Sequence, residues 1–299
     1  MSESSANFGI GGKSRRNKMN NIAIFGHKGY LGKQLKCYFE SKGVSCSGFD
    51  MPECDITNDQ FWEEFCPEAY DTILFFSGLT GTEKSFTDAQ RYLAVNESGL
   101  LSLLNKLVQF GEKAPRVIFP SSRLVYKGSE ELLTEDAEKE TKTVYAVNKL
   151  ACEGYLAAYS NRFGIPYNVI RICVPYGSII ATEYSYGTIG FFKKQAETGK
   201  IQLYGDGALR RTFTHVSDIC NIVDEIARQR IDGVFNIGGE NLSLTEVASV
   251  IASKVNASVE YVPWPDEALR IESGSTCFDS GRLAETIGYK TYRKLTEEL

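Results

Sequence analysis

A glycine-rich turn near the start of the chain most constrains what this sequence can fold into. The apolar run at residues 21–25 leads directly into GHKGYLG, residues 26–32, and an amphipathic stretch follows. A turn of this kind between a strand and a helix lets backbone N–H groups approach a pyrophosphate. Its GxxGxxG spacing differs from the usual GxGxxG, and three glycines also suit a tight packed turn. The motif predicts cofactor contacts at Gly26, Gly29, Tyr30, Leu31 and Gly32.

Apolar and amphipathic segments alternate through the first half of the chain. We expect strands at residues 21–25, 44–49, 72–76, 116–119 and 167–172, and helices at 30–41, 59–65, 90–110 and 144–163. Strands rich in Ile, Phe and Val without polar alternation indicate a sheet buried on both faces. The order predicts an α/β fold, a Rossmann-like doubly wound parallel sheet with a smaller C-terminal substrate-binding lobe.

The chain divides into three predicted parts. Residues 1–18 are polar and have no apolar core, so we expect a disordered leader and neither a signal peptide nor a membrane span. Residues 19–177 form the predicted cofactor-binding domain. Residues 178–299 supply mainly the substrate-binding lobe, with segments near 211–239 returning to the main domain. In this half, Ser243 and Glu246 form a capping-box pattern that opens a helix.

Composition excludes several classes of function. A net charge of −5 gives no general attraction to nucleic acid or to an anionic membrane. The eight cysteines are scattered without a CxxC pair, and the chain has only two histidines. This pattern supports neither a disulfide scaffold nor a zinc site. We expect a cytoplasmic protein with no metal, no nucleic-acid partner and no membrane partner.

Asp50 ends the second predicted strand, where an acidic residue would hydrogen-bond the adenosine ribose. A carboxylate there would repel the 2′-phosphate of NADP, so the sequence favours NAD. Lys28 is the contrary residue, because its side chain could reach a 2′-phosphate. Asp55 could cap the next helix or contact adenine, and it is expected at the cofactor together with Ile56.

Tyr145 and Lys149 lie four residues apart on a predicted helix, which places them on one face. A phenol is a poor base at neutral pH, and an adjacent ammonium favours its phenolate form. Ser122 follows a predicted strand at the end where open α/β sheets bind ligands. These three residues are the predicted catalytic set, with Ser121 as the alternative hydroxyl.

Together these features resemble the extended short-chain dehydrogenase/reductase family, in its nucleotide-sugar epimerase, dehydratase and ketoreductase branch. The resemblance runs from residue 21 to residue 289. Besides the residues above, it rests on AVNESGLLSLL, SSRLVY, RICVPYG, YGDGALRRTFTHVSD, FNIGG and CFDSGRLAETIGY.

The resemblance implies a role for particular residues. Tyr145 is the general acid/base, Lys149 tunes it and binds ribose, and Ser122 positions the substrate hydroxyl. Asn96 supports the cofactor side of the site. The substrate, a nucleotide-diphosphate sugar, is expected to contact Ser122 and Thr80, with Arg211 and Arg270 on its diphosphate.

Three departures from the family pattern bear on the reaction. Arg123 and Leu124 stand where the dehydratases carry an Asp-Glu pair, which argues against a dehydratase. Val174 replaces an Asn common in epimerases, and the segment 50–55 is short, as in ketoreductases. The leading hypothesis is an NAD-dependent NDP-hexose 4-epimerase that transiently oxidises a sugar hydroxyl. An NDP-4-keto-6-deoxysugar reductase or dehydrogenase is the alternative, followed by a catalytically silent nucleotide-binding regulator. A homodimer is expected.

Overall fold

The computed structural model describes residues 19–180 and 186–298. The predicted leader at residues 1–18, and the loop residues Glu183 and Tyr184, lie outside these ranges. Six parallel strands form the main sheet in the order β2-β1-β3-β4-β5-β9. They are β1 (Asn21–Phe25), β2 (Ser45–Phe49), β3 (Thr72–Phe75), β4 (Arg116–Ser122), β5 (Tyr167–Ile172) and β9 (Gly233–Asn236).

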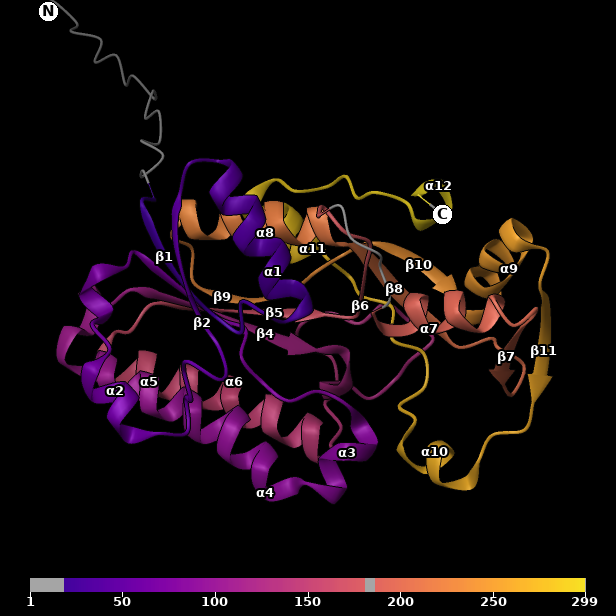
Figure 1. The fold of residues 1–299 in the computed structure, drawn as a ribbon, viewed down its shortest axis with the longest axis horizontal. Helices are drawn as coiled ribbons and strands as arrows, with labels where there is room; N and C mark the ends of the chain where they lie inside the picture. The colour runs from indigo at the N-terminus through magenta and orange to yellow at the C-terminus, as the bar shows by residue number, and fades with distance from the viewer. Residues whose placement is uncertain (1–18, 181–185, 299) are drawn as a thin grey trace, which may run out of the picture.

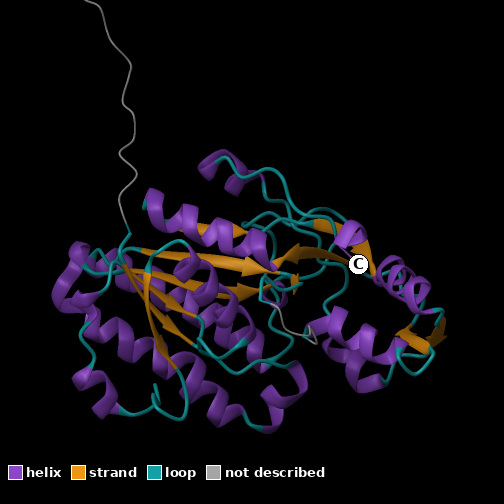
Figure 2. Cartoon of the chain, turned by 45° about the horizontal axis from the view of Figure 1, so that its top comes forward, coloured by secondary structure: helices purple, strands orange, loops and turns teal. Residues whose placement is uncertain are grey.

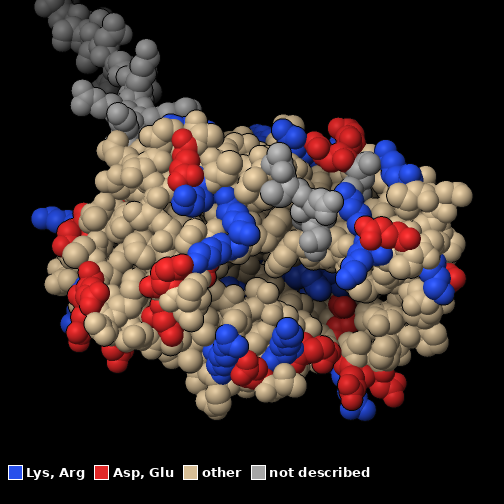
Figure 3. All heavy atoms as spheres, viewed as in Figure 1, with Lys and Arg blue, Asp and Glu red and all other residues tan. Residues whose placement is uncertain are grey.

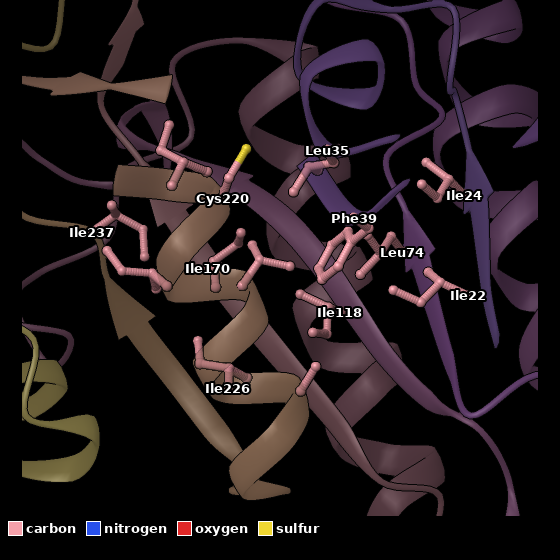
Figure 4. Packing of buried hydrophobic residues seen from close by; sticks show 14 of the residues in the cluster. Ile22, Ile24, Leu35, Phe39, Leu74, Ile118, Ile170, Cys220, Ile226 and Ile237 are labelled. Atoms are coloured by element: carbon pink, nitrogen blue, oxygen red, sulfur yellow. The ribbon is translucent and has the colours of Figure 1, made fainter. Parts of the chain in front are cut away.

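Both faces of this sheet are buried, which explains the uninterrupted apolar runs of its strands. In β1, Ile22 and Ile24 point into one core, whereas Ala23 and Phe25 point into the other. Figure 4 shows the first core, where isoleucines of β1, β4 and β5 pack against side chains of the covering helices. Because successive side chains of a strand alternate between faces, only an all-apolar run can fill two cores.

Helices cover the two faces (Figures 1 and 2). One layer holds α1 (Tyr30–Ser41), α8 (Val216–Gln229) and α11 (Gly281–Ile287). The other holds α2 (Asp59–Glu64), α5 (Gly99–Leu107) and α6 (Val144–Phe163), with α3 (Thr82–Thr87) and α4 (Ala89–Tyr92) at its end. The predicted α/β fold with a doubly wound parallel sheet is therefore confirmed.

A smaller lobe, to the right in Figure 1, has its own apolar core. It contains a sheet in the order β10-β8-β6 and the parallel pair β11-β7. The strands are β6 (Val174–Tyr176), β7 (Lys200–Tyr204), β8 (Arg210–His215), β10 (Glu240–Ser243) and β11 (Ser258–Val262). The helices are α7 (Gly187–Ala196), α9 (Leu244–Val255), α10 (Asp266–Ile271) and α12 (Leu295–Glu298). Ser243 and Glu246 form the capping box of α9.

The chain passes between the two parts more than once. After β8 of the smaller lobe, α8 packs beside α1, and β9 pairs with β5 at the edge of the main sheet. The chain then returns to the smaller lobe at β10. Within the described ranges, no helix is both long enough and apolar enough to cross a membrane.

The helix expected at residues 90–110 is not uniform. Between α4 and α5 the chain forms a π-helical segment, Leu93–Ser98, and 3₁₀ turns follow at Val108–Lys113, where Gly111 has a φ of 53°. Extra residues in a helical turn displace side chains from the regular periodicity, and such segments recur at functional sites. Here the displaced turn contains Asn96. The hydrophobic pattern could not reveal it, because the apolar face continues through both helices.

Candidate functional site

Two connected cavities cross the carboxyl ends of the main-sheet strands. The first, of about 370 Å³, extends from the glycine-rich turn to α6, and the second, of about 380 Å³, extends to the end of β2. Their linings share Gly26, Gly29, Phe76 and Gly78. Figure 3 shows the surface hollowed between the main domain and the smaller lobe, with Lys and Arg side chains flanking the hollow. An open parallel sheet binds ligands at this edge.

The glycine-rich turn brings the backbone of β1 against that of β3. Gly26 has a φ of +81°, and a Cβ atom there would lie 2.7 Å from backbone atoms of Phe76. A Cβ atom on Gly32 would lie 2.1 Å from the Gly26 carbonyl oxygen. Helix α1 begins at Tyr30, and the first N–H groups of a helix have no intrahelical acceptor. Tyr30 and Leu31 line the first cavity, which suits an anionic group there.

Asp50 lies at the far end of the second cavity. Its carboxylate accepts hydrogen bonds from the backbone N–H groups of Lys28 (2.8 Å) and Met51 (2.9 Å). The Lys28 ammonium donates to the Met51 carbonyl (2.8 Å) and pairs with Glu53. Glu53 thus holds Lys28, the one residue whose presence favoured NADP, close to Asp50.

The other predicted cofactor residues near this end are Asp55 and Ile56, and both line the second cavity. One oxygen of Asp55 accepts hydrogen bonds from the Thr57 N–H (2.9 Å) and the Thr57 hydroxyl (2.7 Å). These bonds lower the pKa of Asp55 below its usual range. Helix α2 is capped by Asn58, so Asp55 orders its own turn and is not the helix cap.

Asn96 lines neither cavity but holds the loop between them. Its side-chain oxygen accepts from the Leu79 N–H (2.7 Å), and its amide group donates to the Leu79 carbonyl (3.1 Å). The Asn96 side chain is buried, whereas Leu79 is partly exposed. Leu79 and Gly78 line the second cavity. Asn96 therefore acts on the site by positioning this loop.

Ser122, Tyr145 and Lys149 all line the first cavity. Tyr145 lies in the first turn of α6, where the Thr143 side chain caps the helix by accepting from the Ala146 N–H (3.0 Å). Lys149, one turn later, donates to the Pro120 carbonyl in β4 (2.8 Å). Ser122 ends the same strand, so β4 and α6 bring the three side chains together.

Burial dominates the electrostatics of this group. It raises the pKa of Tyr145, and nearby Tyr186 adds to this effect, while a hydrogen bond with Ser122 opposes it. Burial also lowers the pKa of Lys149 to about 8. Both shifts favour the uncharged forms. Burial therefore opposes the phenolate that the Tyr–Lys pair was expected to favour.

The predicted substrate residues are more dispersed. Thr80 lines the first cavity together with Ser122. Arg211 is buried outside both cavity linings, where it pairs with Glu272 (2.7 Å) and donates to the Gly274 carbonyl (2.6 Å). Arg270 is exposed on α10 and also lines neither cavity. Neither arginine thus lines the cavity that holds Ser122, Tyr145 and Lys149, although Arg211 lies near Arg123.

One residue that sequence reasoning did not assign to the site is Arg123. It follows Ser122 directly, in a 3₁₀ turn at Arg123–Val125, and lines the first cavity. Its Nη1 atom is buried without a hydrogen-bond partner, and so is the Ser121 hydroxyl in the same lining. Its place beside Ser122, the predicted catalytic serine, is the signal that the sequence offers, but there it serves only to argue against a dehydratase.

Within the described ranges, no three His, Cys, Asp or Glu side chains lie together in an arrangement that could hold a metal ion. All eight cysteines are free thiols.

Comparison with known proteins gives consistent matches. The model of the NAD dependent epimerase/dehydratase family matches residues 22–238. dTDP-L-rhamnose 4-epimerase from Burkholderia thailandensis is 28% identical over 249 residues, which cover 70% of this chain and 68% of the relative. UDP-glucuronate 4-epimerase from Thermodesulfobacterium geofontis is 25% identical over 68% of this chain and 63% of its own length. The solved structure of MoeE5 in complex with UDP-glucose and NAD has a TM-score of 0.80 and 25% identity, and the match covers 93% of this chain and 95% of MoeE5.

Proposed function

Because the chain belongs to the NAD dependent epimerase/dehydratase family, we propose that it is an NAD-dependent nucleotide-sugar 4-epimerase that transiently oxidises the C4 hydroxyl. The observation that carries this proposal is one cavity lined by the catalytic set and the glycine-rich turn. The set is Ser122, Tyr145 and Lys149. Relatives that are named 4-epimerases of dTDP-L-rhamnose and UDP-glucuronate support the choice of carbon.

The residues present fit NAD. The turn at Gly26 and the start of α1 would receive the pyrophosphate, and Asp50 would accept hydrogen bonds from the adenosine ribose. Lys149 would bind the other ribose. The hydride acceptor for C4 and, in the same turnover, the hydride donor would be the NAD held by these residues. A cofactor that ends each cycle in its starting form suits a site that retains it.

The side chains of the cavity handle the proton. Tyr145 takes the C4 hydroxyl proton as its phenolate and returns it to the epimerised oxygen, while Ser122 hydrogen-bonds that oxygen. Bringing an unperturbed phenol of pKa near 10 to neutral pH requires about 4 kcal/mol, and burial, which raises the pKa of Tyr145, adds to this requirement. The Lys149 ammonium supplies part of this stabilisation once a ribose holds it close, because opposite charges interact strongly in a desolvated site.

The reductase alternative rested partly on Val174. This side chain is buried in the core of the smaller lobe, whereas its neighbours Cys173 and Pro175 line the first cavity. The Val174 side chain therefore contributes to packing and not to the cavity lining. The absence of an Asn at this position is then no longer an argument for a reductase.

The first test is to denature the purified protein and identify any released nicotinamide nucleotide by mass spectrometry. Near-stoichiometric NAD is expected. Turnover is then followed by NMR in D₂O with UDP-glucose, UDP-glucuronate and dTDP-L-rhamnose. A C4 epimer without deuterium at C4 is expected, because the hydride returns from bound NAD. A protein that is purified without NAD, and that consumes added NADPH with a 4-keto sugar, would contradict the epimerase proposal and favour the reductase.

Tyr145→Phe should lower kcat by about 10²- to 10⁴-fold, the usual range for a general acid/base. Tyr159→Phe is the matched control, because this tyrosine lies on the same helix, donates to Asn105 of α5 and lines neither cavity. Equal activity of Tyr145→Phe and the control would contradict the proposed role.

We further propose a homodimer that works in the cytoplasm. Large exposed apolar side chains, Phe86, Leu93 and Val147, come from α3, the π-helical segment and α6, which pack together. Such a patch suits a second copy of the chain. Eight free thiols suit a reducing compartment. Light scattering of the wild type and of Val147→Glu tests the dimer.

A further inference from the structure

Arg123 places an uncompensated positive charge in the catalytic cavity. Among the described residues lining that cavity, the only charged side chains are Arg123 and Lys149, and none is an Asp or a Glu. Lys149 has the Pro120 carbonyl as its acceptor, whereas Nη1 of Arg123 is buried without a partner. A buried guanidinium N–H left unpaired costs about 1–3 kcal/mol. A residue that keeps this cost beside a catalytic serine calls for an explanation by a ligand.

The nearby ion pair of Arg211 with Glu272 does not neutralise the charge of Arg123. Arg211 lies close enough to Arg123 that their repulsion contributes to lowering the pKa of Arg211. The Glu272 carboxylate accepts from Arg211 (2.7 Å) and from the Gly274 N–H (3.0 Å), both on one oxygen, and in the described part of the chain it accepts no hydrogen bond from Arg123. The wall of the cavity that carries Arg123 therefore remains positive and suits an anionic group on the substrate.

We propose that Arg123 binds the C6 carboxylate of a nucleotide-linked hexuronic acid, an inference that rests on the proposed function. If Ser122 holds the C4 oxygen, Arg123 in the same cavity lining lies near a carbon next to C4, and of the two such carbons C5 is the one whose substituent carries a charge in a hexuronate. In a hexuronate that substituent is a carboxylate, whose two oxygens match the planar fork of a guanidinium. The diphosphate is attached at C1, across the sugar ring from C4. The unpartnered Ser121 hydroxyl offers the same carboxylate a second donor.

The test uses binding, so that it does not depend on turnover. NAD-loaded Tyr145→Phe protein, with and without Arg123→Gln, is titrated by calorimetry with UDP-glucuronate and UDP-glucose, and with the same two sugars carried on dTDP. These sugars differ only in a carboxylate or an alcohol at C6. We expect the glucuronate to bind about 10- to 100-fold more tightly, as hydrogen bonds between charged groups allow. Arg123→Gln should abolish this preference and change binding of the glucose nucleotide less than about 3-fold.

Two further variants complete the test. Arg123→Lys should restore part of the preference, because it keeps the charge without the fork. Arg162→Gln removes an exposed arginine at the end of α6 and should leave both affinities unchanged. Equal binding of the two sugars to the Tyr145→Phe protein overturns the inference. So does an equal loss for both sugars in Arg123→Gln, which would place Arg123 on the diphosphate, and so does the failure of every nucleotide sugar to bind.

These outcomes separate the inference from the proposed function. A protein that binds the glucuronate through Arg123 but does not epimerise any of the nucleotide sugars keeps the hexuronate site and loses the epimerase. A protein that epimerises UDP-glucose without a preference for the carboxylate keeps the epimerase and loses the hexuronate site.

Discussion

The Lys149 ammonium lies 5.7 Å from the centre of the Tyr145 ring and hydrogen-bonds the Pro120 carbonyl at the end of β4. Both side chains are buried, and burial lowers the pKa of Lys149 from 10.5 to about 8 while it raises that of Tyr145. Without a ligand, the Tyr145–Lys149 pair is therefore buried at an energetic cost. This unfavourable burial predicts how the protein responds to losing the lysine.

Lys149→Met should stabilise the NAD-free protein while abolishing activity. A lysine whose folded pKa is lowered destabilises the fold fully below pH 8, here by about 3 kcal/mol. The penalty fades as pH rises from 8 to 10.5, because the folded lysine is then neutral and removing the proton from the unfolded lysine costs less at each higher pH. We expect a melting temperature about 5 °C higher at pH 7 and no gain near pH 10.5. Thermal unfolding at both pH values measures this, with Lys254→Met on the exposed face of α9 as control. A lower melting temperature at both pH values would refute it.

The carboxylates at the end of β2 predict how cofactor preference can be changed. Asp50→Ser removes a charge-assisted acceptor and should weaken NADH binding about 10- to 100-fold. Adding Glu53→Gln releases the Lys28 ammonium, which then attracts a 2′-phosphate, so the double variant should bind NADPH more tightly than NADH. Fluorescence titration with the two reduced cofactors gives the ratio. Glu40→Gln breaks a comparable exposed pair, with Lys36, and should leave the ratio unchanged.

Asn96→Ala should loosen the loop that lines the second cavity. It leaves the N–H and the carbonyl of Leu79 without their side-chain partner, which should cost about 2 kcal/mol of unfolding free energy. NADH affinity should fall with it, because the loop borders the cofactor cavity. Denaturant unfolding and NADH titration measure the two effects. Asn105→Ala removes an exposed asparagine that accepts from Tyr159 and serves as the control. Lost stability with unchanged NADH affinity would make Asn96 a residue of the scaffold alone.

The parts of the fold and of the site that could be predicted are those encoded by residues close together in the sequence. Strands β1 and β5 and helices α1 and α6 have the predicted bounds, because apolar runs and periodic faces are read from neighbouring residues. Ser122, Tyr145 and Lys149 were selected in the same way, from short motifs, and the structure places them on one cavity.

Features that depend on distant partners were not predictable. The pairing of Arg211 with Glu272 joins residues 61 positions apart, so no local pattern signals that this arginine is already occupied. Arg123 shows the converse case. Its identity is plain in the sequence, but only the folded cavity reveals that one of its nitrogens has no acceptor.

Replacing glycine by alanine should have opposite effects at Gly32 and at Gly154. Gly32→Ala would place a Cβ atom 2.1 Å from the Gly26 carbonyl oxygen, and this backbone atom cannot move without opening the cofactor turn. We expect a loss of about 3 kcal/mol and of NAD binding together. Gly154 lies exposed in the interior of α6, and an added methyl group would meet no atom from outside the helix within 4 Å. Gly154→Ala should therefore stabilise the protein by about 0.5–1 kcal/mol through helix propensity. Urea unfolding of both variants measures the difference. Equal shifts in the two midpoints would show that the close approach at Gly32 does not constrain the turn.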